Sequence, residues 1–267
     1  MEKIPTISVC TIVRNEQKQI ESFLESLNKF ADEIIIVDTG STDDTVKLIK
    51  SFIASHKSKN IRLLTHSLGD SFHYGLAKNF SIKKATKDYV IVLDADERLS
   101  DEFKRSVRGF LSKERPIVSS VIRKDELLSH LIDYPERIVR RDSGIMYGLG
   151  EQSKVHEQLS HNVLAKQFSE IIWHQQRENH YVIRPQRIFQ QLELQIDRVP
   201  KTKSFFGHFI RGIWYFFYRF RKIYFVRRLY KDGALGFKYA FMRSLDAFLI
   251  ELFVGLKPSS KSKKYWP

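Results

Sequence analysis

The stretch Asp88-Tyr89-Val90-Ile91-Val92-Leu93-Asp94-Ala95-Asp96-Glu97 joins a run of apolar residues to a row of carboxylates. The apolar run shows no alternation with polar residues, which is typical of a central parallel strand covered on both faces. Open α/β sheets bind their ligands beyond the carboxyl ends of such strands. We therefore expect Asp94 and Asp96 to project into a ligand site and not into the core.

These two carboxylates, spaced i, i+2 at the end of the expected strand, point the same way and repel each other. A bound divalent cation relieves that repulsion, and carboxylate oxygens suit Mg²⁺ or Mn²⁺ that is shared with phosphate oxygens. The alternative is a solvated acidic turn before a helix that Ser100 caps. The short motif alone leaves both interpretations open.

Strands and helices alternate through the first part of the chain. Apolar, β-rich runs predict further strands at 6–13, 33–37 and 61–65. Apolar residues at helical spacing follow each of these strands, which together predict a doubly wound parallel sheet. Beyond Asp96 the pattern becomes irregular, and we expect strands at 117–123, 137–141 and 168–173, then a helix at 181–196 that Pro200 ends.

The net charge of +14 lies almost wholly at one end of the chain. From Arg198 onward there are 16 Lys and Arg against 3 acids, whereas residues 1–197 hold 29 against 28. This asymmetry predicts a nearly neutral domain at 1–197, a basic helical region at 198–257 and a flexible basic tail at 258–267.

Polar residues follow three of the expected strands, after Val13, Val37 and Leu93, and these strand ends should lie side by side. Such an edge suits a nucleotide. Asp38 can accept from a base N–H or a ribose hydroxyl, while the amides of the following Gly-Ser-Thr turn stay free for polar ligand atoms. The chain has no Gly-x-Gly-x-x-Gly and no Walker lysine motif, so ordinary dinucleotide and P-loop sites are disfavoured.

Three ordered motifs resemble family 2 glycosyltransferases of GT-A fold: Thr11-Ile12-Val13-Arg14-Asn15-Glu16, Val37-Asp38-Thr39-Gly40-Ser41-Thr42-Asp43-Asp44-Thr45 and Leu93-Asp94-Ala95-Asp96-Glu97. The resemblance covers residues 5–175 and is strongest to bacterial lipopolysaccharide core β-glucosyltransferases, whose pattern also includes Lys78-Asn79, Arg137 and Val155-His156-Glu157. It implies a Rossmann-like sheet that binds a nucleotide-sugar. The residue pattern beyond this sheet predicts a C-terminal amphipathic helical extension.

The resemblance also implies roles for individual residues. Thr11, Glu16 and Asp38 would hold the nucleoside, Lys78 the base or phosphates, Asp94 the ribose or donor sugar, and Asp96 the metal. The donor would be a UDP-sugar such as UDP-glucose, and transfer would invert the anomeric carbon. Two departures affect the nucleoside contacts: Thr39 replaces the second Asp of the commoner Asp-Asp-Gly-Ser form, and Lys78 stands where many relatives carry Arg.

Glu157 is the candidate general base, since a carboxylate that removes the acceptor's proton contributes about 10²–10⁴-fold to the rate. Its place in the Val-His-Glu motif favours it over Glu151, although a surface carboxylate that caps a helix is the alternative. His174 follows an expected strand and can ligate the metal, or serve as a structural group. Arg137 suits a diphosphate or an anionic acceptor, with solvated strand-edge charge as the alternative.

The basic region carries two amphipathic helical patterns. On a helical wheel, Arg211 and Lys222 lie opposite an apolar arc of roughly 120°. Seven residues form this arc: Phe205, Phe206, Phe209, Ile213, Phe216, Phe217 and Phe220. A second stripe lies in 235–256, where four charged residues argue against a membrane span. Aromatic apolar faces with Lys and Arg opposite predict helices that lie on an anionic membrane surface.

Other functions and placements remain to be weighed. A nucleotidyltransferase is the rival enzyme class, and a basic aromatic module that binds nucleic acid is the rival binding function. Confinement of the charge to amphipathic helices argues against nucleic acid. The helices can also cap the catalytic domain or form the interface of a homo-oligomer. The start at Met1 shows no secretory signal and Cys10 is the only cysteine, so we expect a cytoplasmic enzyme bound to the inner face of the cytoplasmic membrane and acting on a glycolipid or lipid-linked acceptor.

Overall fold

The computed structural model describes residues 4–66, 74–148, 158–175 and 205–256 of the 267-residue chain. Packing divides the chain into two compact units. The first, called here the catalytic unit, comprises Met1–Glu126 and Ile132–Gln175, and the second, the helical unit, comprises Leu127–Leu131 and Gln176–Pro267. The helix expected at 181–196 and the boundary expected at 197 lie outside the described residues.

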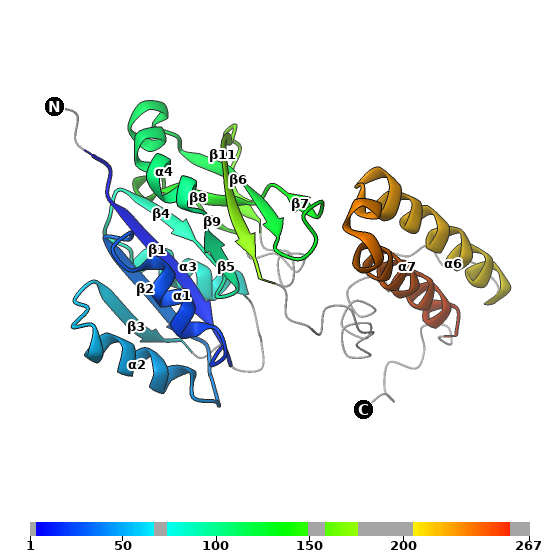
Figure 1. Cartoon of the computed structure of the whole chain (residues 1–267), viewed down its shortest axis with the longest axis horizontal. Coiled ribbons are helices and arrows are strands. Elements are labelled where there is room, and N and C mark those ends of the chain that lie inside the picture. Colours follow the sequence, from blue (N-terminus) through cyan, green and yellow to red (C-terminus); the bar gives the residue numbers. More distant parts are fainter. Residues whose placement is uncertain (1–3, 67–73, 149–157, 176–204, 257–267) are drawn as a thin grey trace. The chain divides into compact units, whose positions relative to one another are not determined.

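The catalytic unit is built on a nine-stranded sheet with helices on both faces (Figure 1). Its strands are β1 (Ile7–Val13), β2 (Glu33–Asp38), β3 (Ile61–Thr65), β4 (Tyr89–Val92), β5 (Glu97–Leu99), β6 (Val118–Asp125), β7 (Ile132–Asp133), β8 (Glu136–Arg140) and β11 (Lys166–His174). The helices are α1 (Ile20–Leu27), α2 (Thr45–Ser55), α3 (Tyr74–Lys84) and α4 (Asp101–Glu114), and a small ribbon is formed by β9 (Met146–Tyr147) and β10 (Leu159–Ser160).

The sheet has the strand order β3-β2-β1-β4-β8-β6-β11-β5, with β7 beside β6. β1 pairs in parallel with β2 and β4, as expected for the doubly wound half. Beyond β4, where the sequence pattern is irregular and predicts no strand direction, β8 runs antiparallel to both β4 and β6. The connection from β6 to β8 contains only the short strand β7 and no crossover helix, so the chain returns in the opposite direction.

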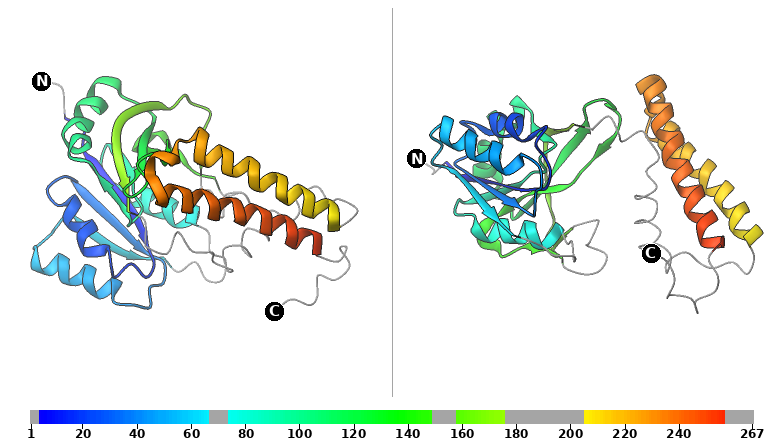
Figure 2. Two further views of the ribbon diagram at one scale, coloured as in Figure 1. Left: turned by 45° about the vertical axis from the view of Figure 1, so that its right-hand side comes forward. Right: turned by 90° about the horizontal axis from the view of Figure 1, so that it is seen from below.

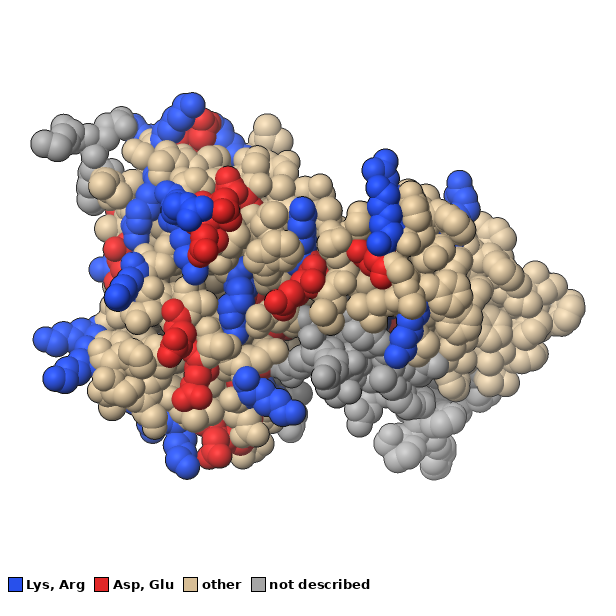
Figure 3. Space-filling model, viewed as in Figure 1, with Lys and Arg blue, Asp and Glu red and all other residues tan. Residues whose placement is uncertain are grey.

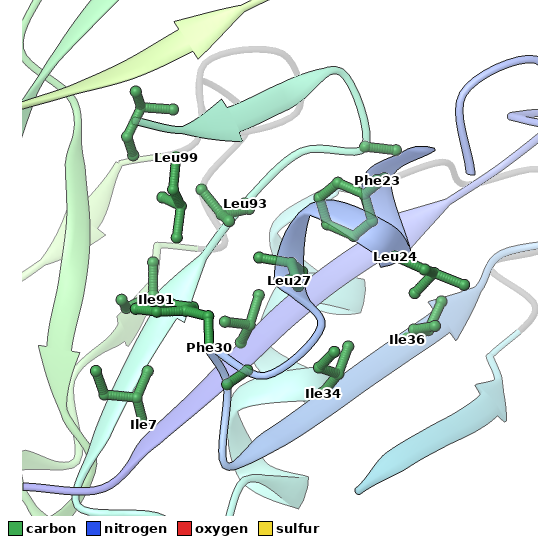
Figure 4. Packing of buried hydrophobic residues seen from close by; sticks show 14 of the residues in the cluster. Ile7, Phe23, Leu24, Leu27, Phe30, Ile34, Ile36, Ile91, Leu93 and Leu99 are labelled. Carbon is green, nitrogen blue, oxygen red and sulfur yellow. The ribbon is translucent and has the colours of Figure 1, made fainter. Parts of the chain in front are cut away.

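Alternate side chains of the central strands enter two cores. On one face, Phe23, Leu24 and Leu27 of α1 pack over Ile34 and Ile36 of β2 (Figure 4). The helices α2 and α4 add to this core through Ile49, Phe52, Phe103, Val107 and Leu111. The other face packs against α3 and the β9–β10 ribbon through Cys10, Ile35, Val92, Ile82 and Tyr147. Burial on both faces explains why β1, β2 and β4 are continuous apolar runs.

The strand β5 was not expected from the sequence. Its three residues pair antiparallel with the end of β11, directly after Asp96. The cap that follows was anticipated: the Ser100 hydroxyl accepts a hydrogen bond from the Phe103 amide at 3.1 Å and begins α4. The acidic motif is therefore held between β4, which pairs with β1 and β8, and β5, which pairs with β11, and is not a loose turn.

The helical unit contains α6 (Phe205–Phe220) and α7 (Gly233–Leu256), which lie side by side (Figures 1 and 2). They are joined by a π-helical turn at Arg221–Val226 and a 3₁₀ turn at Leu229–Asp232. Leu128, from the loop between β6 and β7, is fully buried in this unit against Ile223, Leu229 and Ala240. Among the described helices, none has the length and apolar content needed to cross a membrane.

Candidate active site

The chain order fixes where the site lies. Strands β2 and β3 lie on one side of β1. The chain then returns, so that β4 lies on the other side of β1. A doubly wound sheet binds its ligand at such a reversal, outside the carboxyl ends of the strands. Here those ends carry Arg14 after β1, Asp38 at the end of β2, and Asp94 and Asp96 after β4.

The turn after β2 is held by its own side chains. Asp38 is 5% exposed, and its carboxylate accepts hydrogen bonds from the amides of Gly40 at 3.2 Å and Ser41 at 3.1 Å. The prediction that these amides stay free for a ligand is wrong, because an Asp side chain readily satisfies the backbone two and three residues on. Gly40 adopts a φ of 111°, which a side chain would strain.

The turn after β1 is tied to the turn after β2. Asn15, in the left-handed region with a φ of 58°, accepts a hydrogen bond from the Thr42 amide at 2.8 Å, and the Glu16 amide donates to the Thr45 hydroxyl at 2.8 Å. Thr11 lies fully buried in β1, and its hydroxyl oxygen has no hydrogen-bond partner among the described residues. Of the residues expected to hold the nucleoside, Glu16 and Asp38 thus lie at two turns joined by hydrogen bonds, whereas Thr11 lies within β1.

Asp94 is held by two buried cations. Lys78 of α3 approaches one carboxylate oxygen at 3.1 Å, and Arg137 of β8 approaches the other at 2.7 Å. Burial raises the pKa of Asp94, but Arg137 and Lys78 outweigh burial and hold that pKa well below its usual range. Asp94 is therefore ionised and fixed in orientation at neutral pH.

Glu97 connects this ion pair to a second arginine. The fully buried Glu97 carboxylate accepts from the Asp94 amide at 3.0 Å and from Arg123 of β6 at 3.0 Å, and it also pairs with Arg137. Arg123 in turn donates to Asp133 of β7 at 2.9 Å. Burial lowers the pKa of Arg137, but Asp94 and Glu97 outweigh it and hold the pKa well above the usual value.

Asp96 faces a different partner from Asp94, although the two were expected to share one cation site. His174, at the end of β11, lies with Nε2 at 3.5 Å from an Asp96 oxygen and Nδ1 at 3.5 Å from an oxygen of Asp125. Burial lowers the pKa of His174, but Asp125 and Asp96 outweigh burial and raise it to about 10. Without a metal the imidazole is thus protonated and bridges two carboxylates.

The loop that carries these aspartates is anchored on both sides. Arg98 donates to the Ala95 carbonyl at 2.8 Å and to the Gln19 carbonyl, just before α1, at 3.2 Å. The Asp96 carbonyl accepts from the Gln175 amide at 2.7 Å. Because both ends of the loop are bonded to neighbouring elements, the positions of Asp94 and Asp96 are fixed by the fold.

Asp96 and His174 lie close enough together to be two protein ligands of one divalent cation. Their nearest atoms are 3.5 Å apart, a separation that two ligands of one ion can have when each lies about 2.0–2.2 Å from it. Asp125 on the other imidazole nitrogen would orient the ring, as carboxylates do for metal-binding histidines. No group of three or more such side chains is arranged for a metal within the described residues. An ion here would complete its shell with substrate oxygens and water, which is usual for Mg²⁺.

Two adjacent residues of α3 join the acidic cluster to the β9–β10 ribbon. Asn79 donates to the Tyr147 carbonyl at 2.9 Å and accepts from the Tyr147 amide at 2.7 Å, as a strand partner would. The Tyr147 ring lies 5.5 Å from the Lys78 ammonium. Lys78 therefore pairs with Asp94, while its neighbour Asn79 binds the backbone of β9. The candidate base Glu157 and its alternative Glu151 lie outside the described residues.

A comparison with known protein families agrees with this arrangement. The family described as Glycosyl transferase family 2 matches residues 8–170, which is more than half of the chain. The chain belongs to glycosyl transferase family 2. The family and the GT-A fold were predicted correctly from the motifs, and the C-terminal helical region was predicted correctly from its helical spacing and charge.

Curated relatives of this family 2 chain include a TPR repeat-containing protein of Synechococcus elongatus, 31% identical over 62% of this chain and 38% of the relative. The glycosyltransferase SunS of Bacillus subtilis is 31% identical over 58% of this chain and 35% of its own length. The lipopolysaccharide core biosynthesis glycosyltransferase LpsC of Rhizobium meliloti is 32% identical over 58% of this chain and 57% of its own length. The matched segment is therefore well under two thirds of each relative.

Among solved structures, the mannosyltransferase PcManGT of Pyrobaculum calidifontis is similar to this chain with a TM-score of 0.51 and 14% identity, over 94% of this chain and 74% of that one. That structure is a complex with GDP-Man and Mn²⁺. At this identity the likeness establishes the fold of the family 2 chain.

Proposed function

We propose that this chain transfers a hexose, with inversion, from a nucleoside-diphosphate sugar such as UDP-glucose to a lipopolysaccharide-core or other lipid-linked glycan. Membership of glycosyl transferase family 2 supports the transfer reaction. The name of LpsC supports the acceptor class. A lipid-linked acceptor resides in a membrane, so we propose that the enzyme works at the inner face of the cytoplasmic membrane.

The observation that carries this proposal is that Asp94 and Asp96, two residues apart, have partners of different kinds. Asp94 is compensated by Lys78 and Arg137, so it needs no metal to stay ionised. Its carboxylate has room to accept a hydroxyl of the ribose or donor sugar, because two oxygens offer about four acceptor positions. Lys78 was expected to meet the base or phosphates, and Arg137 a diphosphate or an anionic acceptor. We propose that both residues act by keeping Asp94 ionised and fixed in orientation.

Asp96 and His174 are the residues that would hold Mg²⁺ or Mn²⁺. When bound, the ion neutralises the charge that grows on the diphosphate as the sugar leaves. The GDP-Man and Mn²⁺ complex of PcManGT supports this choice of donor class and metal. Asp125 would keep the His174 ring in place in both the metal-free and the metal-bound enzyme.

The nucleoside would be held where β1 and β2 end, by Thr11, Glu16 and Asp38. The Thr11 hydroxyl oxygen supports this role, because a buried polar atom that lacks a partner among the described residues is a group that a ligand can satisfy. Asp38 keeps further acceptor positions beside those used by Gly40 and Ser41.

Glu157 would remove the proton from the acceptor hydroxyl. Glu157→Gln keeps the shape and removes the base, so turnover should fall by about 10²-fold or more while donor affinity stays almost unchanged. Glu151→Gln, six residues earlier in the same stretch, is the matched control and should be mild. A dead Glu151→Gln beside an active Glu157→Gln would reverse the assignment.

The function itself is tested by a screen of the full chain against UDP-glucose, other UDP-hexoses and GDP-mannose, with and without Mn²⁺. A donor present at 100 times its Kd should stabilise the fold by about 2.7 kcal/mol, and transfer to a lipid-linked glycan should release the nucleoside diphosphate. Stabilisation by nucleoside triphosphates with release of inorganic diphosphate would instead identify a nucleotidyltransferase. No stabilisation by any nucleotide-sugar would refute the proposal.

A further inference from the structure

The contact between α6 and α7 is lined mainly by small and polar residues. On α6 the buried residues are His208 and Gly212. On α7 they are Gly236, Ala240, Ser244, Ile250, Glu251 and Val254. The helices approach closely: a Cβ added to Gly255 would lie 2.8 Å from the His208 Cβ, and one added to Gly212 would lie 3.0 Å from the Phe248 ring. The large apolar side chains of these helices therefore lie mostly outside their contact.

A buried ionic cluster holds the two helices in register. Glu251 of α7 is 3% exposed and accepts from Arg211 of α6 at 2.7 Å, and it lies 3.1 Å from His208 Nδ1. A buried charge is costly unless it is paired, so these three residues specify one alignment of the helices. The arrangement of α6 and α7 is thus fixed in part by buried polar groups, and not by aromatic packing alone.

One outer face of the α6–α7 hairpin (residues 205–256) is aromatic. Cross-helix ring contacts join Phe209 to Phe248 at 5.8 Å, Phe216 to Phe241 at 5.5 Å and Phe220 to Phe237 at 5.6 Å. On helical wheels the three rings of each helix fall within about 40° of one another. Phe206 and Phe217 flank this line on α6 and are 68% and 65% exposed. We call these eight residues the aromatic face.

The opposite side of the hairpin combines a charged pair with aromatic residues, among them the exposed Trp214 and Tyr218. Arg243 pairs with Asp246 at 3.2 Å and lies over the Tyr239 ring, and all three positions are about 180° from the α7 rings of the aromatic face on a helical wheel. The exposed charged residues of the hairpin are all basic: Arg219, Arg221, Lys222, Arg227, Arg228, Lys231 and Lys238. The three acids within 205–256 are each paired inside the helical unit.

These charges are also uneven along the hairpin. The exposed cations lie between residues 219 and 238, around the connection of the two helices. The end formed by the start of α6 and the end of α7 shows neither acidic nor basic side chains in Figure 3. An aromatic surface on a hairpin whose exposed charges are all cations matches a layer of acyl chains under anionic headgroups.

We infer that the α6–α7 hairpin binds an anionic lipid bilayer through its aromatic face, with the hairpin lying in the plane of the headgroups. Phenyl rings enter the boundary of the acyl chains, while the arginines and lysines around the helix connection reach lipid phosphates with their long side chains. Binding of the hairpin to a bilayer does not itself depend on the proposed function. The reason for that binding does rest on the proposed function, because a lipid-linked acceptor is located in a membrane.

The test is flotation of the full chain with phosphatidylcholine vesicles that contain or lack phosphatidylglycerol, at low and high salt. We expect binding to the anionic vesicles, weakened by salt, and little binding to the neutral ones. The variant with Phe206→Ser and Phe217→Ser should reduce binding at least about tenfold, because two apolar side chains no longer enter the lipid. Arg221→Gln with Arg227→Gln should lower the preference for anionic lipid by about tenfold or more.

Tyr218→Ser is the matched control, since Tyr218 is 47% exposed on the same helix but lies opposite the aromatic face, and its binding should be unchanged. Circular dichroism should show unchanged helicity for every variant, because each altered side chain is exposed. The inference is overturned if no vesicle binds the chain, if Tyr218→Ser is as damaging as the double Phe variant, or if the Phe changes alter the sedimenting mass and not lipid binding. That last result would assign the face to a second copy. Donor stabilisation measured without vesicles tests the proposed function separately.

Discussion

Asp94 and Asp96 show how neighbouring residues of one motif can meet opposite surroundings. Asp94 lies between the cations Lys78 and Arg137, whereas Asp96 lies beside His174, whose imidazole also contacts Asp125. The i, i+2 spacing predicted that both carboxylates face one edge of the sheet. It could not predict the difference, because the deciding side chains come from α3, β8 and β11, up to 80 residues away.

Asp96→Ala tests the metal assignment. The Asp96 side chain lies at the surface of the site and packs no core, so the variant should fold normally but lose Mn²⁺-dependent stabilisation by donor and nearly all transfer. Thermal denaturation with and without Mn²⁺ and nucleotide-sugar measures both effects. Asp101→Ala, in the exposed first turn of α4, is the control and should keep metal dependence. Full activity of Asp96→Ala in excess chelator would rule the assignment out.

Glu97→Gln tests a positioning residue that the motif did not reveal. Glu97 accepts from the Asp94 amide, from the buried Arg137 and from the half-buried Arg123, so its neutralisation leaves those guanidinium charges poorly compensated. We expect a loss of about 3–5 kcal/mol in the free energy of unfolding, measured by urea denaturation. Glu102→Gln breaks an exposed pair with Arg105 and should change stability by less than about 1 kcal/mol.

If Glu97 acts through Asp94 and not only on stability, the residual folded Glu97→Gln enzyme should also show a raised KM for donor at permissive temperature. An unchanged KM together with lowered stability would reduce Glu97 to a structural role.

Sequence inspection could name Asp94, Asp96, Lys78 and Arg137 because they lie in short motifs. Glu97 lay within such a motif, but its role depends on Arg123 and Arg137, which only the pairing of β6 with β8 brings to it.

At the scale of elements, local pattern predicted the parallel half of the sheet well. Strands at 6–13, 33–37 and 61–65 and the helix at 205–220 coincide closely with β1, β2, β3 and α6. The strands predicted at 117–123, 137–141 and 168–173 are also found, as β6, β8 and β11. Their directions were not predicted, because strand direction is set by the length of the connections and not by residue composition. β5 was missed because three residues are too few to show any period.

The close contact of α6 and α7 gives a prediction at this scale. Gly255→Leu should force the helices apart beside His208, because even a Cβ there would lie 2.8 Å from the His208 Cβ. We expect faster hydrogen exchange throughout 205–256, with a cost of about 1–3 kcal/mol to local stability. Gly109→Leu on the exposed side of α4 is the control, since no atom lies within 4 Å of its added Cβ. Equal exchange rates in both variants would show that the helices tolerate separation.

At the scale of the whole molecule, the charge count separated a neutral part from a basic part but could not place Leu127–Leu131. Those residues are central in sequence, yet they pack with the C-terminal helices. His130 lies 2.9 Å from Asp232, and Leu128 is fully buried in the same unit. No composition window detects a short apolar loop whose partners are about 100 residues downstream.

Leu128→Ala is therefore expected to destabilise a region distant in sequence. Removal of this buried side chain should cost about 2–5 kcal/mol and speed hydrogen exchange in 205–256, while donor-dependent stabilisation of the catalytic unit persists. Leu127→Ala is the adjacent control, because Leu127 is 51% exposed and its truncation should have little effect. Faster exchange confined to β6 and β7 in Leu128→Ala would mean that the loop is supported by the sheet instead.

The packing of Leu128 against Leu229 and Ala240 also orders events during synthesis. Ribosomes add about 5–20 residues per second, so this loop emerges on the order of 5–20 seconds before its partners exist. In a nascent chain that has completed β6, β7 and β8, the residues that bury Leu128 have not yet been synthesised, so the apolar loop stays exposed. Closure of the helical unit consequently follows completion of β6, β7 and β8, and in that interval we expect the exposed loop to be open to chaperones and proteases.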